Sequence, residues 1–224
     1  MKAVIFDFNG TMIFDTKMND AAWRTFIEKY TGKVITDEEM SEHVHGQPNT
    51  NTIRHFINRD LTDQEVALYS EEKEVLYRAL CLTEKDLFTL VAGLEPLLDR
   101  LKRRGIPFTI ATAANRNNVE FYFEQFTLSR WFSIDKIVYD DGTLRGKPEP
   151  DVYLRACRIL DKEPKECIVV EDSLAGLLAA KRAGAGRIIA IVSTLDIAAI
   201  QSQSTADACI KDFNGFEKIA GLEE

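Results

Sequence analysis

The sequence predicts an α/β protein with a Rossmann-like, doubly wound parallel sheet as its core and an inserted, all-helical cap subdomain. Two observations predict this fold class. Short apolar runs of strand length alternate with amphipathic helical stretches along most of the 224-residue chain, and one long stretch near the N-terminus shows helical periods without a convincing strand. Because strands that alternate with helices form βα units, a parallel sheet with helices on both faces is expected.

Each expected strand is a continuous apolar run, the pattern of a strand that is buried on both faces. The first run meets an acidic residue and a glycine turn, and the fourth ends at two acidic residues. In chain order the runs are Lys2–Phe8, Ile106–Thr112, Lys136–Tyr139, Cys167–Val170 and Ile188–Val192.

The helices between these strands are predicted from the spacing of their apolar residues. Leu94–Arg104 places leucines at positions 94, 97, 98 and 101, which share one helix face, and it ends in basic residues before Gly105. Basic residues in the last turn and a glycine just beyond it are typical of a helix C-terminus. Similar patterns occupy Val119–Phe126, Val152–Leu160 and Leu174–Ala183.

Residues 15–88 interrupt the alternation of strands and helices. Helical periods run over Ala21–Tyr30 and Asp63–Leu80, and no convincing strand accompanies them. We therefore expect a core domain formed by residues 1–14 and 89–224, and a helical cap formed by residues 15–88.

The charge balance excludes several classes of partner. The chain has 36 acidic and 28 basic residues, a formal net charge of −8. Such a surface repels phosphate backbones and anionic lipid, so neither nucleic acid nor a membrane is an expected partner. No run approaches the ~20 apolar residues of a membrane span, and the first apolar stretch is too short for a secretory signal. The chain has four cysteines and no Cys-x-x-Cys pair, so we expect free thiols in a cytoplasmic protein. We also expect a monomer.

Polar residues gather where the expected strands end. In an open parallel sheet, ligands bind beyond the carboxyl ends of the strands, so these positions are the informative ones. The first strand leads into Asp7 and Asn9–Thr11, and the second ends at Thr112. The fourth leads into Glu171–Ser173, and Lys147 lies in a Gly-Lys-Pro-Glu-Pro-Asp segment before another helix.

Acids, a hydroxyl and a lysine at one sheet edge suit phosphoryl chemistry. Clustered carboxylates are costly unless they bind a cation, and hard oxygen ligands with room for water suit Mg²⁺. A lysine, a hydroxyl and the backbone N–H groups of turns that lead into helices make a phosphate cradle. A carboxylate aimed at that phosphate can act as a nucleophile and form an acyl phosphate. The sequence therefore predicts Mg²⁺ as the cofactor and a small phosphorylated metabolite as the partner.

Four segments of the chain resemble the motifs of the haloacid dehalogenase (HAD) superfamily, in the subgroup of β-phosphoglucomutase-like and phosphoglycolate-phosphatase-like enzymes. The segments are Asp7–Thr11, Thr112 at a strand end, Gly146–Asp151, and Val170–Ser173 followed by Gly176 and Ala183-Gly184. They occur in the family's order with a helical insertion between the first two, and the resemblance covers essentially the whole chain.

The resemblance implies that Asp7 is both the nucleophile and a Mg²⁺ ligand. It implies that the backbone carbonyl of Asn9 and the carboxylate of Asp172 complete the protein ligands, and that Glu171 holds a metal-bound water. It also implies that Lys147 pairs with Asp7 and with the phosphate.

On the phosphate side, the resemblance implies that Thr112 and the Ala113 N–H group hydrogen-bond the transferring phosphoryl group. Gly10, Thr11 and Asn115 are further candidate substrate contacts. Threonine is also a common helix N-cap, and the simpler interpretation of Asn115 is that it opens a surface helix.

The resemblance implies that the cap closes over the site, excludes water and sets substrate choice. His45 lies in the stretch where relatives place a specificity loop, and Arg54 could reach a second anionic group, although both positions also fit an exposed surface. The mutase-like relatives have a histidine and an arginine where this chain has Asp20 and Asn49. Without that positive charge a second phosphate would be held poorly, which favours hydrolysis over mutase chemistry.

Position 9 departs from the family pattern. The family's phosphatases and mutases carry an aspartate there as general acid and base, whereas this chain carries Asn9. An amide cannot cycle a proton near pH 7, and the loss of such help costs about 10²- to 10⁴-fold. Four explanations remain open: a natural variant with weak or different activity, another proton donor such as Asp15 or a cap residue, an engineered inactive form, or deamidation of Asn9 beside Gly10, which would leave an aspartate.

The expected function is therefore that of a Mg²⁺-dependent phosphatase, acting on a small phosphorylated metabolite through an aspartyl-phosphate on Asp7 and impaired by Asn9 unless another group transfers the proton. Two alternatives stay open. One is a β-phosphoglucomutase-like sugar-phosphate mutase, and the other is a catalytically weak or inactive protein that binds phosphate or regulates.

Overall fold

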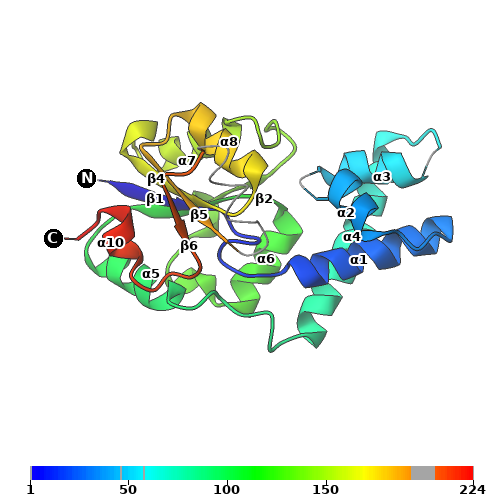
Figure 1. Cartoon of the computed structure of the whole chain (residues 1–224), viewed down its shortest axis with the longest axis horizontal. Helices are drawn as coiled ribbons and strands as arrows, with labels where there is room; N and C mark the ends of the chain where they lie inside the picture. The colour runs from blue at the N-terminus through cyan, green and yellow to red at the C-terminus, as the bar shows by residue number, and fades with distance from the viewer. Residues whose placement is uncertain (1, 46, 58, 193–204, 224) are drawn as a thin grey trace. The chain divides into compact units, whose positions relative to one another are not determined.

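The computed structural model describes residues 2–45, 47–57, 59–192 and 205–223. The chain forms two compact units, one of Met1–Phe14 with Thr89–Glu224 and one of Asp15–Phe88. The first unit holds the sheet, and the second is built from helices (Figure 1).

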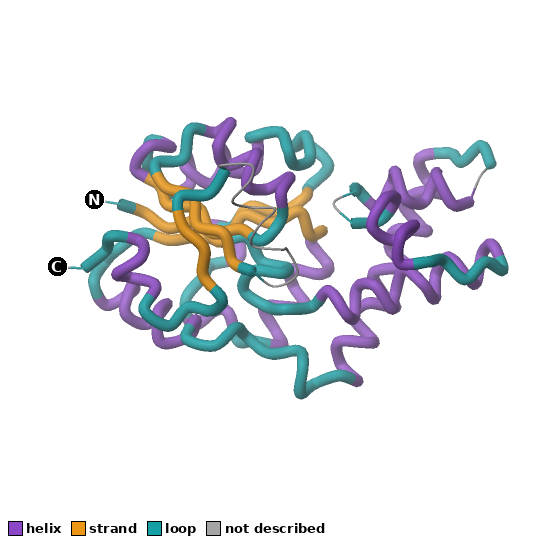
Figure 2. Tube along the Cα trace, viewed as in Figure 1, coloured by secondary structure: helices purple, strands orange, loops and turns teal. Residues whose placement is uncertain are grey.

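The sheet has six strands in the order β3-β2-β1-β4-β5-β6, and every neighbouring pair is parallel. Figure 2 shows these strands, in orange, between layers of helices. The predicted fold class is confirmed. The strands are β1 (Ala3–Phe6), β2 (Phe108–Asn115), β3 (Val138–Asp140), β4 (Cys167–Glu171), β5 (Arg187–Ile191) and β6 (Ala208–Ile210).

Helices cover both faces of the sheet, with α7 and α8 on one face and α5, α6 and α10 on the other (Figure 1). Side chains from alternate strand positions therefore enter two cores. Ile5 and Val169 belong to the core beneath α7 and α8, whereas Phe6 packs on Phe213 and Phe216 at ring-centroid distances of 5.8 and 6.3 Å. The helices are α5 (Leu94–Arg103), α6 (Arg116–Gln125), α7 (Asp151–Ile159), α8 (Leu174–Ala183) and α10 (Phe216–Ala220), with 3-10 turns at Leu128–Arg130, Ile134–Lys136 and Pro164–Glu166.

The strand order reverses between β1 and β4. From β1 the chain passes to β2 and β3 on one side, whereas β5 and β6 follow β4 on the other. In open α/β sheets, ligands bind beyond the carboxyl ends of the two strands that flank such a reversal. The fold therefore singles out the residues that follow Phe6 and Val170, which lie opposite each other in the β1–β4 pair.

The helical unit interrupts the sheet unit at one point. Ile13 and Leu90 form an antiparallel bridge there, and the Val91 N–H donates to the Met12 carbonyl at 2.9 Å. The two segments of the sheet unit are thus joined by their own backbone hydrogen bonds, immediately before the chain leaves and after it returns.

The helical unit has its own core, centred on Trp23 and Phe26 of its first helix. Thr36 and Thr62 each begin a helix with a capping box, in which side chain and backbone exchange hydrogen bonds and satisfy the first N–H groups. No strand occurs in the described part of this unit, and no described helix of the chain is long and apolar enough to cross a membrane. The unit's helices are α1 (Thr16–Thr31), α2 (Asp37–His43), α3 (Asn49–Ile57) and α4 (Asp63–Thr83).

Some elements differ from the sequence expectation. The helices α2 and α10 and the strand β6 contain only three to seven residues each, too few to show a clear period. The nine-residue helix α3 is also absent from the sequence expectation. The expectation that the second strand ends at Thr112 is wrong. β2 continues to Asn115, because it keeps pairing with β3, where Asn115 lies opposite Asp140 beyond an irregularity in the register.

Replacing Phe6 by alanine tests the aromatic core beneath α5 and α10. The Phe6 ring is fully buried, at 0% exposed, so Phe6→Ala should lower the free energy of unfolding by about 3–5 kcal/mol, measured by urea denaturation. Lys165→Ala, at an exposed position of the same unit, is the control and should change that free energy by less than about 0.5 kcal/mol. Losses of similar size in the two variants would contradict this placement of Phe6.

Candidate active site

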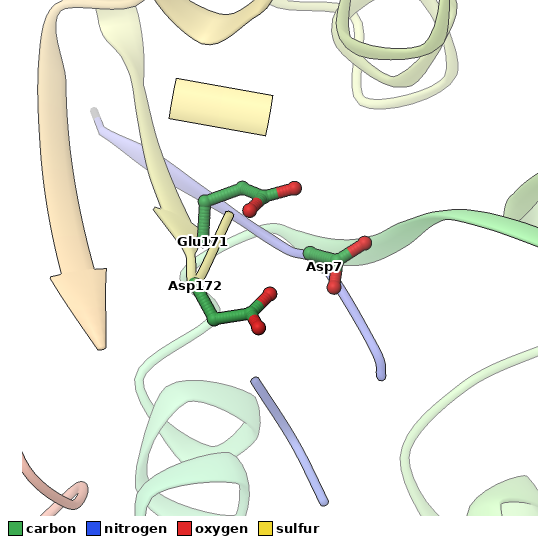
Figure 3. A group of neighbouring side chains, drawn as sticks. All are labelled: Asp7, Glu171 and Asp172. Atoms are coloured by element: carbon green, nitrogen blue, oxygen red, sulfur yellow. The ribbon is translucent and has the colours of Figure 1, made fainter. Parts of the chain in front are cut away.

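Three acidic side chains meet at the carboxyl ends of β1 and β4, where the strand order reverses. The Asp7 N–H donates to the Val170 carbonyl at 3.0 Å, which extends the pairing of the two strands by one residue. Glu171 and Asp172 follow Val170 directly. One carboxylate oxygen from each of Asp7, Glu171 and Asp172 lies within 4.8 Å of the others, and Figure 3 shows the three side chains gathered beside the strand ends.

The ammonium group of Lys147 lies between two of these carboxylates. Its Nζ donates to Asp7 Oδ1 at 2.7 Å and to Glu171 Oε1, and the Lys147 side chain is only 10% exposed. Buried carboxylates are strongly unfavourable unless they are paired. The lysine that the sequence predicts at this edge therefore supplies the charge that these two acids require.

The same contacts set the ionisation of the pair. Burial raises the pKa of Asp7 to about 7 against the attraction of Lys147, and the negative charge of Glu171 adds to the rise. For Lys147, burial by itself lowers the pKa, but the attraction of Asp7 and Glu171 outweighs it and holds the pKa well above its ordinary value. Lys147 therefore remains a fixed positive charge beside Asp7.

Glu171 is held in place by four donors. Its Oε1 accepts from Lys147 and from the Tyr153 hydroxyl at 3.1 Å. Its Oε2 accepts from the Ser173 backbone N–H at 2.7 Å and from the Ser173 hydroxyl at 3.0 Å. Ser173 also begins α8, since its Oγ accepts from the Gly176 N–H at 3.0 Å. These bonds give Glu171 a fixed position as the second partner of Lys147.

Two glycines leave the space that the carboxylates occupy. A Cβ atom on Gly176 would lie 1.7 Å from Glu171 Oε1, and one on Gly10 would lie 2.0 Å from Asp172 Oδ2. Gly10 also has a φ of +74°, which side chains rarely adopt. Beside it, the buried Thr11 donates from Oγ1 to Asp172 Oδ1 at 3.5 Å. The structure thus brings Gly10 and Thr11 to the acidic group.

Thr112 comes to the same sheet edge on the neighbouring strand β2. Phe6 lies opposite Ile110 in the β1–β2 pair, and Thr112 follows two residues later. Its hydroxyl oxygen accepts from the Ala114 N–H at 3.1 Å, and its side chain is 2% exposed. The adjacent Ala113 is exposed.

Helix α6 contributes two contacts near this edge. Asn115 begins the helix, since its Oδ1 accepts from the Asn118 N–H at 2.9 Å, the helix-opening role that the sequence leaves open beside substrate binding. Tyr122 of the same helix accepts a hydrogen bond at 2.8 Å from Asn9 Nδ2. Its ring also stacks on Phe8, with a centroid distance of 4.3 Å.

The candidate residues of the helical unit make contacts within that unit. His45 Nε2 lies 3.0 Å from Asp20 Oδ1. Arg54 donates to the Leu61 carbonyl at 2.8 Å and to Asp63 Oδ1 at 2.7 Å, so its guanidinium group joins the end of α3 to the start of α4. The sequence analysis does not predict these two structural partners of Arg54.

Further polar side chains of the helical unit bond to one another in buried or partly buried contacts. Asn49 and Lys73 both donate to Glu74 Oε1 at 2.7 Å. Asp15, a candidate proton donor in the sequence analysis, is 4% exposed and accepts from the Tyr77 hydroxyl at 2.6 Å.

Sequence reasoning misses Tyr122 and Tyr153 as polar contacts of this region. Each lies on the apolar face of a helix, where a tyrosine is most simply a core residue. The one available signal is the hydroxyl group itself, because a buried phenol needs a hydrogen-bond partner.

The donor set fits a hard divalent cation. Asp7, Glu171 and Asp172 offer the oxygen ligands that Mg²⁺ prefers, and within the described ranges they are the one group of three or more acidic, histidine or cysteine ligands close enough to share an ion. Each carboxylate oxygen of Glu171 already accepts two hydrogen bonds, which leaves Glu171 less room to contact an ion directly.

The fold and the site together define a class: a doubly wound α/β protein with three carboxylates and one lysine at the sheet edge, whose excess of negative charge suits a cation. Comparison with known proteins specifies the family. The chain belongs to the haloacid dehalogenase-like hydrolases, whose family model matches residues 1–184.

Similar proteins include phosphatases and a mutase. Hexitol phosphatase A of Escherichia coli (strain K12) is 28% identical over 195 residues, 87% of this chain and 85% of that protein. The β-phosphoglucomutase of Bacillus subtilis (strain 168) is 30% identical over 194 residues, 82% of this chain and 80% of that protein. The crystal structure of a HAD hydrolase, family IA, variant 3, from Entamoeba histolytica HM-1:IMSS matches with a TM-score of 0.89 and 37% identity, over 96% of this chain and 95% of that one.

Gly176→Ala tests the close packing of α8 on Glu171. Alanine normally favours a helix over glycine by about 1 kcal/mol, but here the added methyl group would displace a buried carboxylate. We expect the free energy of unfolding to fall by about 1–3 kcal/mol in urea denaturation. Gly146→Ala is the matched control, because a Cβ there meets nothing within 4 Å, and it should change that free energy by less than about 0.5 kcal/mol. A Gly176→Ala protein as stable as the wild type would contradict the packing.

Proposed function

We propose that the protein is a Mg²⁺-dependent phosphatase that hydrolyses a small phosphorylated metabolite through an aspartyl-phosphate on Asp7. The observation that carries this proposal is the pairing of Asp7 with Lys147 beside Glu171 and Asp172. Membership of the haloacid dehalogenase-like hydrolases supports it, as does similarity to a hexitol phosphatase.

In the proposed reaction, a carboxylate oxygen of Asp7 attacks the phosphorus atom in line with the ester oxygen. The new P–O bond forms as the ester P–O bond breaks, and the leaving alcohol departs with a proton. Water then attacks the acyl phosphate, which releases inorganic phosphate and restores the Asp7 carboxylate. Throughout, the fixed charge of Lys147 faces the negative charge that develops beside Asp7.

Asp7, Asp172 and the backbone carbonyl of Asn9 would hold the cation. When bound, Mg²⁺ neutralises charge on the transferring phosphoryl group and orients it.

The remaining phosphate contacts come from two turns. We assign the Thr112 hydroxyl and the Ala113 N–H to the phosphoryl oxygens on one side, with Asn115 as a further contact. On the other side, Gly10 and Thr11 remain candidate contacts, in a turn whose positive φ at Gly10 is typical of anion-binding concavities. In that turn the Thr11 N–H donates to the Phe8 carbonyl at 3.2 Å.

The helical unit of residues 15–88 is the proposed cap, which would exclude water and select the substrate. His45 and Arg54 remain its candidate substrate contacts.

A mutase is less well supported, because a mutase must hold a second phosphate. Where the mutase-like relatives have a histidine and an arginine, this chain has Asp20, which faces His45, and Asn49, which faces Glu74. We therefore favour hydrolysis of a monophosphate of a small polyhydroxy compound.

The amide at residue 9 should slow the hydrolysis reaction. Without a positioned acid at residue 9, the leaving alcohol takes its proton from solvent or from another group, and such a loss costs about 10²- to 10⁴-fold. We propose a slow enzyme whose nucleophile and phosphate contacts are intact.

A substrate screen tests the proposed function. Sugar, hexitol and glycolate phosphates are offered to the Asn9 protein, to Asn9→Asp and to Asp7→Asn, with release of inorganic phosphate as the readout. We expect slow release by the Asn9 protein, release that is about 10²-fold or more faster in Asn9→Asp, and none in Asp7→Asn. Release by Asn9→Asp alone would indicate a degenerate or engineered site. Release by neither would contradict the proposal and favour a phosphate-binding protein.

Cation binding is tested separately from turnover. A ligand that binds only the folded state raises the melting temperature, so a Mg²⁺ concentration a hundredfold above its Kd should raise it by roughly 5–10 °C. Asp172→Asn should lose most of this rise, and EDTA should reverse it. The control Asp135→Asn, at an exposed carboxylate of the same unit, should keep it. Equal rises in all three proteins would place the cation elsewhere.

A further inference from the structure

The Asn9 side chain makes a contact that the proposed reaction does not use. Its Nδ2 donates to the hydroxyl of Tyr122 at 2.8 Å, across 113 residues of sequence. Asn9 lies two residues after the proposed nucleophile. Tyr122 lies on α6, the helix that follows the strand carrying Thr112. One hydrogen bond therefore links the loop after β1 to the helix after β2.

Tyr122 has little freedom to move. Its side chain is 1% exposed, and its ring stacks on Phe8 with an angle of 17° between the ring planes. It also packs at an angle on Phe121, at a centroid distance of 5.8 Å. The ring thus holds Phe8 while the hydroxyl holds the next residue, Asn9. A phenylalanine ring could make the same packing contacts, so packing does not explain why residue 122 carries a hydroxyl group.

The Tyr122 hydroxyl can bond either side chain considered at position 9, the asparagine of this chain or the aspartate of the family pattern. A phenol oxygen accepts from the amide N–H of asparagine, and a phenol O–H donates to a carboxylate. The contact therefore fixes the place of the residue 9 side chain whatever its proton chemistry. A side chain held at its outer end samples fewer positions in the turn after Asp7.

We propose that Tyr122 is a positioning residue that acts through Asn9: its buried hydroxyl holds the Asn9 carboxamide at a set place in the turn that follows Asp7. The inference rests on the proposed function for its effect on rate. The hydrogen bond itself can be tested without any substrate.

A chemical property of Asn9 supplies the substrate-free readout. In an Asn-Gly pair, the backbone nitrogen of Gly10 can attack Cγ of Asn9, which forms a cyclic imide and expels ammonia. Water then opens the imide to aspartate or isoaspartate. The reaction needs Cγ to swing toward Gly10, so a carboxamide tethered to Tyr122 should deamidate slowly, and one without the tether should deamidate faster.

The first experiment measures this deamidation by peptide mapping of the full-length protein after incubation at neutral pH. Tyr122→Phe keeps the ring and removes the hydroxyl, and we expect it to deamidate at Asn9 at least fivefold faster than the wild type. Tyr139→Phe, which removes another hydroxyl of the same unit, should match the wild type. Val138→Ala loosens the opposite core, beneath α7 and α8, and controls for general destabilisation. An unchanged rate in Tyr122→Phe, or an equal rise in Val138→Ala, would overturn the proposal.

The second experiment measures kcat and KM in a double-mutant cycle. Tyr122→Phe should lower kcat about tenfold in the Asn9→Asp background, where the residue 9 carboxyl can transfer a proton and one buried hydrogen bond holds it in place, with KM within twofold. In the Asn9→Ala background the same change should have a clearly smaller effect, because the residue 9 side chain that Tyr122 holds has been removed. An equal loss of kcat in both backgrounds would show a merely structural role and overturn the proposal. If no protein turns over any substrate, the proposed function fails, and the deamidation rates alone decide the role of Tyr122.

Discussion

A buried ammonium group between two buried carboxylates is the interaction on which the site depends. β1 and β4 pair in a register that makes Asp7 and Glu171 neighbours, and both are almost completely shielded from water. Two such anions repel each other and lose their hydration, at a cost of several kcal/mol for each ion. Lys147 offsets that cost by bonding to both. The sheet can bring these acids together only because the segment before α7 returns a lysine to the same point.

The crowding around the carboxylates explains why their other neighbours are small or polar. Gly10 and Gly176 lie where any Cβ atom would meet a carboxylate. Tyr153 and Ser173 complete the hydrogen bonds of Glu171, which leaves that side chain no alternative position. Groups that are fixed before a ligand arrives need no reorganisation during a reaction, and this is the main way in which a protein interior stabilises developing charge.

The core strands and the meeting of Asp7 with Asp172 follow from the sequence because both depend on simple rules: a continuous apolar run forms a buried strand, and parallel strands end at one edge. The short elements β6 and α10 contain too few residues for such a rule. The sequence leaves Arg54 open as an anion contact, and only the packing of α3 against α4 shows its partners. The bond between Tyr122 and Asn9 depends on how α6 packs on the sheet, which no local pattern encodes.

The hydrogen bonds where the chain leaves and re-enters the sheet unit have a consequence for how such a protein can change over time. The Ile13–Leu90 bridge and the bond from Val91 to Met12 join the two segments directly, and the entropy of closing a loop grows only slowly with its length. An inserted segment can therefore lengthen, shorten or be exchanged for another while the strands and their acids stay as they are. Evolution can then vary one module without rebuilding the other.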